Sequence, residues 1–376
     1  MSLKYRGVNL ASYAFDEAPP FEYGKTYVMP GFDVQTGTVW NGGSLDYFVS
    51  KGMNCFPLQF QWELAQPSDY GELDETYMGR IDRFIDECAK RNVTVVLTPH
   101  NFAKRYGKPM NVDQCMGLWS YMADRYGNKP NVLFDLMCEP AAIKVEAWVG
   151  IVNKVALLLR ARGYNRPIII CLGGYAGARS FNETWYGEKS STALLRITDK
   201  NVIFNVHQYN DENWSGEFPN GETTNDPKAD LLTLTTWART NGKKLWLGEF
   251  GAPNTARSRV AIADTLLVLD MHSDVWQGFA WWAAGPWFKG YKLSIEPEGG
   301  VDKPQMAWLA PYLVAPAPEK TEAEKLATWV KAELATIRTS RVAQAALTRE
   351  LVTALDEDID DLTQMSNEVD SKAWLK

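Results

Sequence analysis

Several residue types are scarce in this sequence of 376 residues, and each shortage excludes a class of protein. The three histidines are too few for a histidine-rich metal centre. The five cysteines form no CxxC pair, so zinc and redox motifs are absent and we expect reduced, mostly buried thiols. No apolar run reaches the roughly 18 residues that a membrane span needs. Lys and Arg number 39 against 46 Asp and Glu, and this net charge of −7 argues against nucleic acid as a partner.

Aromatic residues are abundant instead, with 15 tryptophans and an aromatic content of 12%. Large flat side chains stack on the apolar faces of sugar rings as well as filling cores, so the excess hints at carbohydrate. Five tryptophans fall in expected loops or strand exits, where some could line sugar subsites: Trp40, Trp62, Trp185, Trp214 and Trp287.

Short β-rich apolar runs alternate with amphipathic helical patterns along residues 1–314. The runs expected as strands are Tyr5–Leu10, Met53–Leu58, Val93–Thr98, Val132–Met137, Ile168–Cys171, Val202–Val206, Lys244–Leu247 and Val275–Trp281. Asp74–Arg91 and Ala147–Arg162 carry apolar residues at helical spacing. Eight βα units in a segment of this length favour a (β/α)8 TIM barrel over an open sheet. No GxGxxG or P-loop follows the first strand, which argues against a nucleotide-binding fold.

The composition changes after residue 314. Ala315-Pro316-Ala317-Pro318 predicts a short, stiff linker. Residues 319–376 contain no Pro or Gly and carry apolar residues at helical spacing, which predicts a helical tail, either one long helix or a hairpin. The apolar stripe of such a tail needs a partner. It could pack on the barrel of its own chain or associate with a second copy, and the sequence leaves both open.

Two acidic residues stand where a barrel carries its chemistry, at the C-terminal ends of strands. Glu139 follows the fourth expected strand and Glu249 follows the seventh. These strands lie on opposite sides of an eight-stranded barrel, so the two carboxyl groups can flank a bound sugar chain. Glycosidic cleavage needs such a pair, with one group protonated and the other ionised. His100 and His207 follow the third and sixth strands at the same mouth.

Five short strings occur in order at these strand ends. They are Arg6-Gly7-Val8-Asn9, Pro99-His100-Asn101-Phe102, Cys138-Glu139-Pro140, His207-Gln208-Tyr209 and Gly248-Glu249-Phe250-Gly251, and Trp281-Trp282 follows them. Their order resembles family 5 of the glycoside hydrolases, in its endo-β-1,4-glucanase (cellulase) branch. The resemblance runs from about Lys4 to Leu313 and implies a retaining hydrolase that uses no metal or cofactor.

The resemblance also implies a role for each matching residue. Glu139 corresponds to the general acid/base and Glu249 to the nucleophile. His207 is expected beside the acid/base, and Tyr209 is expected to donate a hydrogen bond to the nucleophile. Trp282 corresponds to the platform under the sugar at the cleavage point.

Three further residues are candidates for binding the substrate or supporting the site, and one of them, Cys138, departs from the family pattern. His100 is implied to contact sugar hydroxyls, and Asn101 is a candidate supporting residue beside it. The family has an Asn before the acid/base, where it binds the sugar 2-hydroxyl. This chain has Cys138 there, a weaker hydrogen-bonding group.

A second departure falls on the second strand. The family has an Arg, followed two residues later by Pro, and this Arg helps to keep the nucleophile ionised. This chain has Pro57 and Gln59 at those positions. The two departures leave three readings open: an altered substrate, a slow enzyme, or an inactive barrel that only binds glycan.

The leading interpretation is a retaining endo-β-glycosidase that hydrolyses a β-glucan-like polysaccharide. The alternatives are a catalytically impaired glycan-binding or structural barrel, and a depolymerase of a bacterial exopolysaccharide. The expected partner is a polysaccharide or oligosaccharide, not a nucleic acid or membrane, with a second copy of the chain if the tail self-associates. The first residues lack the apolar stretch of a secretory signal, whereas a polymeric substrate implies extracellular action, secreted or virion-associated, so localisation stays open.

Overall fold

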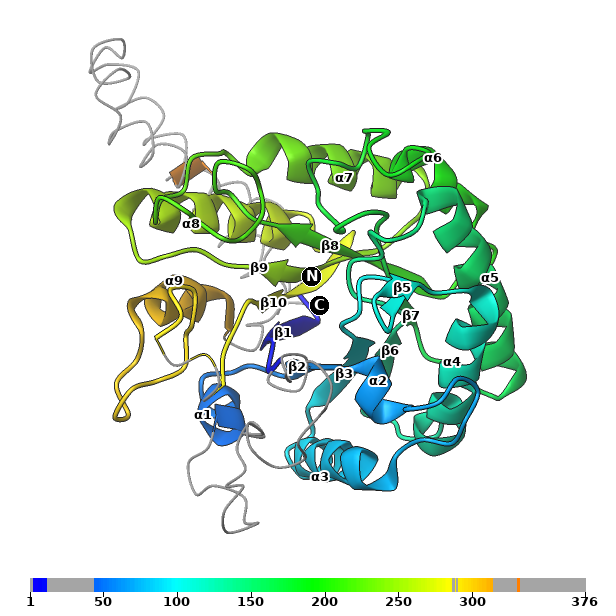
Figure 1. Cartoon of the computed structure of the whole chain (residues 1–376). Helices are drawn as coiled ribbons and strands as arrows, with labels where there is room; N and C mark the ends of the chain where they lie inside the picture. The colour runs from blue at the N-terminus through cyan, green and yellow to red at the C-terminus, as the bar shows by residue number, and fades with distance from the viewer. Residues whose placement is uncertain (1–2, 12–43, 286–287, 289, 314–329, 332–376) are drawn as a thin grey trace, which may run out of the picture. The chain divides into compact units, whose positions relative to one another are not determined.

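A closed barrel of eight parallel strands forms the centre of the molecule. The computed structural model describes residues 3–11, 44–285, 288, 290–313 and 330–331. Within them the barrel strands neighbour one another in the order β1-β10-β9-β8-β7-β6-β3-β2, as Figure 1 shows. The strands are β1 (Tyr5–Val8), β2 (Cys55–Phe60), β3 (Thr94–Pro99), β6 (Val132–Asp135), β7 (Ile168–Cys171), β8 (Val202–Gln208), β9 (Leu245–Phe250) and β10 (Trp276–Trp281).

Helices surround this barrel and connect its strands (Figure 1). The longer ones are α3 (Glu75–Lys90), α4 (Val112–Tyr126), α5 (Val145–Ala161), α7 (Lys228–Thr240), α8 (Ala256–Met271) and α9 (Pro304–Leu313). The shorter ones are α1 (Ser44–Ser50), α2 (Trp62–Ala65), α6 (Ser190–Ala193) and the 3-10 turn η2 (Leu194–Arg196). A small antiparallel hairpin follows β3, formed by β4 (Lys104–Arg105) and β5 (Lys108–Pro109).

Local sequence signals explain where the helices begin. The side chain of Asp74 accepts a hydrogen bond of 2.7 Å from the backbone N–H of Tyr77, which caps the start of α3. Asn111 and Gln114 form a reciprocal capping box at the start of α4. The apolar residues of α3 then repeat at helical spacing and are buried against the strands. The two helices predicted from the sequence are therefore confirmed to within two residues at each end.

The lower interior of the barrel is filled by one apolar layer. Each of the eight strands contributes one buried side chain to it: Tyr5, Cys55, Val96, Leu133, Ile169, Ile203, Trp246 and Ala280. A packed layer of this kind leaves no passage through the barrel. Among the described residues, the end of the barrel that remains open to a ligand is therefore the mouth, where the strands end.

The predicted (β/α)8 fold is confirmed, with all eight expected strands present. The five cysteines are buried, as expected, and none is paired with another in a disulfide. Among the described residues no helix is long and apolar enough to cross a bilayer. The linker 315–318 and the tail 319–376 lie outside the described residues, apart from 330 and 331, so the domain division stays a prediction.

Candidate active site

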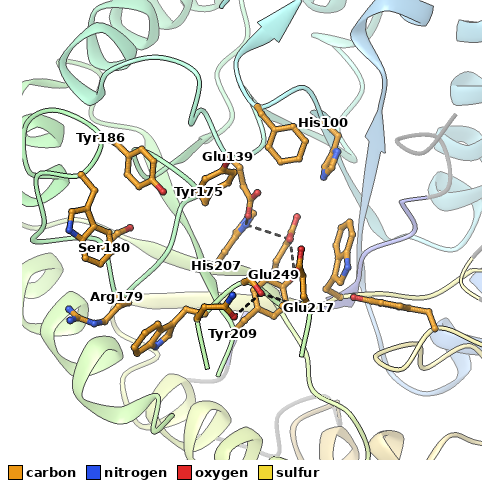
Figure 2. Close-up of a pocket in the computed structure, with 18 residues that line it drawn as sticks. His100, Glu139, Tyr175, Arg179, Ser180, Tyr186, His207, Tyr209, Glu217 and Glu249 are labelled. Carbon is orange, nitrogen blue, oxygen red and sulfur yellow. Dashed lines mark hydrogen bonds and ion pairs between the residues drawn. The ribbon is translucent and has the colours of Figure 1, made fainter. Parts of the chain in front are cut away.

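A pocket of about 850 Å³ opens at the C-terminal ends of the strands. Figure 2 shows that side chains from opposite sides of the barrel converge on it. Glu139, Glu249, His100, His207, Tyr209 and Trp282 all line it, so the structure brings together six of the eight site residues predicted from the sequence. The other two, Asn101 and Cys138, are buried beside it and do not line it.

Glu249 reaches the barrel interior because β9 contains a bulge. Its pairing with β8 shifts after Val206, so that His207 lies opposite Glu249 and Gly248 is the extra residue. Only glycine fits at this position, because a Cβ on Gly248 would lie 2.1 Å from the side-chain oxygen of Asn205. Asn205 accepts a hydrogen bond from the Gly248 N–H at 3.0 Å, and Asn9 donates one to its carbonyl at 2.8 Å. The peptide groups on both sides of Gly248 are therefore held in place.

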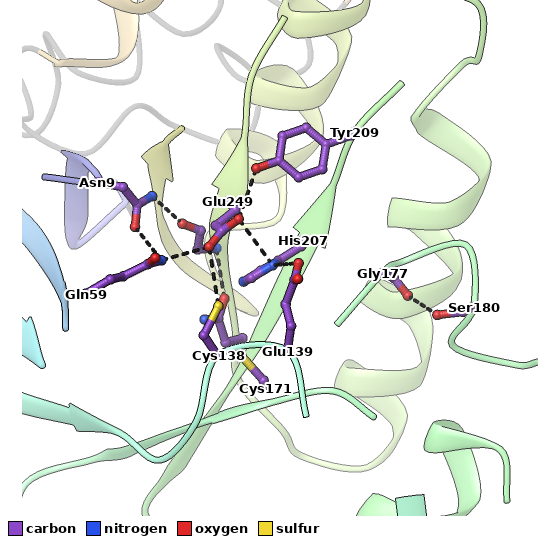
Figure 3. Close-up of polar contacts among 12 residues, drawn as sticks. Asn9, Gln59, Cys138, Glu139, Cys171, Gly177, Ser180, His207, Tyr209 and Glu249 are labelled. Carbon is purple, nitrogen blue, oxygen red and sulfur yellow. Dashed lines mark hydrogen bonds and ion pairs between the residues drawn. The ribbon is translucent and has the colours of Figure 1, made fainter. Parts of the chain in front are cut away.

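Three neutral donors surround the Glu249 carboxylate (Figure 3). Gln59 Nε2 donates to Oε1 at 2.7 Å, Tyr209 donates to Oε2 at 2.9 Å, and the Cys138 thiol lies 3.6 Å from Oε1. Burial raises the pKa of Glu249, since the side chain is almost fully removed from water. The hydrogen bonds from Gln59 and Tyr209 act in the opposite direction, because they favour the ionised form.

One histidine, His207, lies close to the carboxyl groups of both Glu139 and Glu249. His207 Nδ1 lies 2.7 Å from Glu139 Oε1 and 3.5 Å from Glu249 Oε2, so these two oxygens are no more than about 6 Å apart. Burial raises the pKa of Glu139 to about 8, so this carboxyl group is protonated at neutral pH. Burial also lowers the pKa of His207, which keeps the imidazole neutral. One carboxyl group that holds a proton thus faces one that accepts several hydrogen bonds.

His100 and Trp282 form an aromatic wall of the pocket. Their rings are stacked, with centroids 6.0 Å apart and an interplanar angle of 15°. Burial lowers the pKa of His100 to about 4, so this ring is neutral as well. Asn101 instead supports α2, because its side-chain oxygen accepts the backbone N–H of Trp62 at 2.9 Å. Its predicted role in substrate binding stays a prediction.

Further aromatic residues line the far end of the pocket, away from His100. Trp185 is 60% exposed and Trp214 is 38% exposed. The guanidinium carbon of Arg179 lies 5.8 Å and 5.6 Å from the centres of their rings. These two tryptophans were among the five that the sequence suggested for sugar subsites. Trp62 is fully buried and donates to Gln66, while Trp40 and Trp287 lie outside the described residues.

Sequence reasoning missed two residues that support Glu249. Gln59 was noted only as a departure from the family pattern, and Asn9 only as part of a matching string. In the structure Gln59 also donates to Asn9 Oδ1 at 3.3 Å, which orients its amide toward Glu249. Alternation along β2 was the available signal, because it places Pro57 and Gln59 on the same face of the strand.

An eight-stranded barrel with two facing carboxyl groups and aromatic walls at its mouth defines a glycoside hydrolase. The sequence matches the cellulase family, glycosyl hydrolase family 5, over residues 22–285, and the chain belongs to this family. It is 29% identical to the probable endo-β-1,4-glucanase B of Neosartorya fischeri over 78% of this chain and 86% of that protein.

Solved structures agree with this membership. An endo-β-1,4-glucanase from Xanthomonas axonopodis pv. citri that carries three substitutions is 32% identical, with a TM-score of 0.75 over 83% of this chain and 99% of that one. XacCel5A in complex with cellopentaose is 32% identical, with a TM-score of 0.73 over 82% of this chain and 99% of that one. Membership of the cellulase family makes a polysaccharide the class of substrate.

Proposed function

We propose that this protein is a retaining endo-β-1,4-glucanase with Glu139 as general acid/base and Glu249 as nucleophile. The observation that carries the proposal is the different environment of the two carboxyl groups. Glu139 is buried beside a neutral His207 and keeps its proton, whereas Glu249 accepts hydrogen bonds from Gln59 and Tyr209. Burial raises the pKa of both groups, but only Glu249 has hydrogen-bond donors that favour its ionised form, and this difference supports Glu249 as the nucleophile and Glu139 as the acid.

The separation of the carboxyl groups supports retention of configuration. Retaining glycosidases hold them roughly 5–5.5 Å apart, whereas inverting enzymes need roughly 6.5–9.5 Å to admit a water molecule. Glu139 Oε1 and Glu249 Oε2 lie no more than about 6 Å apart, because both are close to His207 Nδ1. This separation falls short of the inverting range.

The reaction then follows in two steps. Glu139 donates its proton to the leaving glycosidic oxygen while Glu249 attacks the anomeric carbon and forms a covalent glycosyl-enzyme. Glu139, now ionised, removes a proton from water, and this water releases the sugar from Glu249. Trp282 and His100 form the wall along which the sugar chain lies, and Trp185 and Trp214 extend it.

The test is release of reducing sugar from a panel of polysaccharides that includes β-1,4-glucans and bacterial exopolysaccharides. We expect hydrolysis of a β-1,4-glucan by the wild-type chain and none by the Glu249→Gln variant, which keeps the shape of the side chain and removes its charge. Binding of β-glucan without hydrolysis by the folded wild type would instead support the glycan-binding barrel.

A further inference from the structure

Cys138 lies at the junction of two overlapping groups of metal-ligating side chains. One group is His100, Cys138 and Glu249, and the other is Cys138, Glu139 and His207. Within each group the ligand atoms all lie within 4.8 Å of one another. Figure 3 shows Cys138 against Glu249, with His207 between Cys138 and Glu139. The shortage of histidine in the sequence argued against a histidine-rich metal centre, and each of these groups contains a single histidine.

The donors suit a thiophilic divalent cation. Thiolate, imidazole and carboxylate are the ligands of zinc, which binds sulfur at about 2.3 Å and oxygen at about 2.0–2.2 Å in tetrahedral geometry. A tetrahedron with these bond lengths has a sulfur–oxygen edge of about 3.5 Å. The observed distance from Cys138 Sγ to Glu249 Oε1 is 3.6 Å.

His207 provides an independent observation. Its Nε2 atom is buried and has no hydrogen-bond partner within the described part of the chain. The side chain is 98% buried, with a relative exposure of 2%. Buried polar atoms are nearly always satisfied, so this unpaired nitrogen, in the same cluster as the thiol, is open to a ligand such as a metal ion or a water molecule.

We propose that one zinc-class divalent cation binds at Cys138 together with Glu249 and His100, with the unpaired Nε2 atom of His207 as its fourth ligand, and thereby inhibits the enzyme. On binding, the Cys138 thiol loses its proton to solvent and its sulfur forms a bond to the metal. Thiolate and carboxylate together balance the two positive charges of the ion. The Glu249 oxygen that forms the second bond to the metal is then withdrawn from attack on the anomeric carbon.

The site is a property of this chain because it depends on the cysteine. An Asn before the acid/base, as in the family pattern, supplies no thiolate, and hard cations such as Mg²⁺ prefer oxygen ligands. Inhibition of hydrolysis rests on the proposed function, but binding of the metal does not.

The test uses the full chain and Co²⁺ as a spectroscopic substitute for zinc. We expect one equivalent of Co²⁺ to produce a thiolate-to-cobalt absorption band that Zn²⁺ removes. The Cys138→Asn variant should lose the band and bind Zn²⁺ more than about tenfold more weakly in calorimetry, because it lacks the thiolate ligand. Cys115→Ala is the matched control, because Cys115 is equally buried but lies in α4, and it should keep the band.

Activity supplies the second measurement. Zn²⁺ should inhibit wild-type hydrolysis, a chelator should restore it, and Mg²⁺ should have no effect. A folded wild type with no thiolate band, a band that persists in Cys138→Asn, or equal inhibition by Mg²⁺ would overturn the proposal. If Cys138→Asn fails to fold, His100→Ala replaces it and should weaken Zn²⁺ binding about tenfold or more. A thiolate band in a protein that hydrolyses no polysaccharide would support the metal site while contradicting the proposed function.

Discussion

Replacing Gln59 by leucine should move the pH dependence of the reaction. The variant removes the 2.7 Å hydrogen bond from Gln59 Nε2 to Glu249 Oε1 and keeps a buried side chain of similar size. A hydrogen bond to a charged group contributes about 1.5–3 kcal/mol, and one pKa unit corresponds to about 1.4 kcal/mol. Because the lost donor stabilised the ionised carboxylate, the pKa of Glu249 should rise, by about one to two units.

The sign of the effect follows from the role of each group. The nucleophile acts when ionised, so the acidic limb of the kcat/KM profile should shift upward in pH by about one to two units. The basic limb reports the deprotonation of Glu139, which has a pKa of about 8, and should stay in place. The bell-shaped pH profile should therefore become narrower. The assay is a pH series of kcat/KM on an activated aryl β-glucan oligosaccharide.

Gln305→Leu is the matched control. Gln305 is also buried, but its amide donates to the carbonyl of Ala252 at 3.3 Å and it does not line the pocket. Its profile should therefore keep the wild-type shape. An unshifted acidic limb in folded Gln59→Leu, or an equal shift in Gln305→Leu, would refute the claim that Gln59 keeps Glu249 ionised.

Four other variants test the catalytic pair, Cys138 and the tail. Glu139→Ala should retain measurable activity on an aryl glycoside, which needs little protonation of its leaving group, whereas Glu249→Ala should lose it; equal losses in steady-state assays would count against the assignment. Cys138→Asn should raise turnover on an unsubstituted β-glucan about tenfold to a hundredfold, since an amide supplies the contact to the 2-hydroxyl; a fall would indicate recognition fitted to another sugar. A chain that ends near Val314 should keep its affinity for glycan and show a lower mass in light scattering; an unchanged mass would reject association through the tail.

The sequence predicted the barrel because its signals are local. Apolar runs and helical spacing each act within a few positions, and the apolar runs located all eight strands. The ends of strands also indicated Glu139 and His207, because a barrel gathers those ends at one mouth.

The contacts around Glu249 needed the structure, because they join distant strands. A bulge at Gly248 turns Glu249 inward, and nothing in the pattern of apolar residues reveals a bulge. Gln59 lies 190 positions from Glu249 in the sequence, so its hydrogen bond is not readable from spacing. Trp62 follows β2, as expected of a strand exit, but it is fully buried and does not line the pocket, and its spacing in the sequence does not reveal this burial.

The stereochemistry of the first product shows directly whether Glu249 acts as the nucleophile of a retaining reaction. If Glu249 forms a covalent intermediate, two inversions at the anomeric carbon leave its configuration unchanged. Proton NMR of a β-glucan digest, recorded before mutarotation, should therefore show the β-anomer first. An α-anomer that appears first would contradict the assignment of Glu249 as nucleophile and the short separation from Glu139 on which it rests.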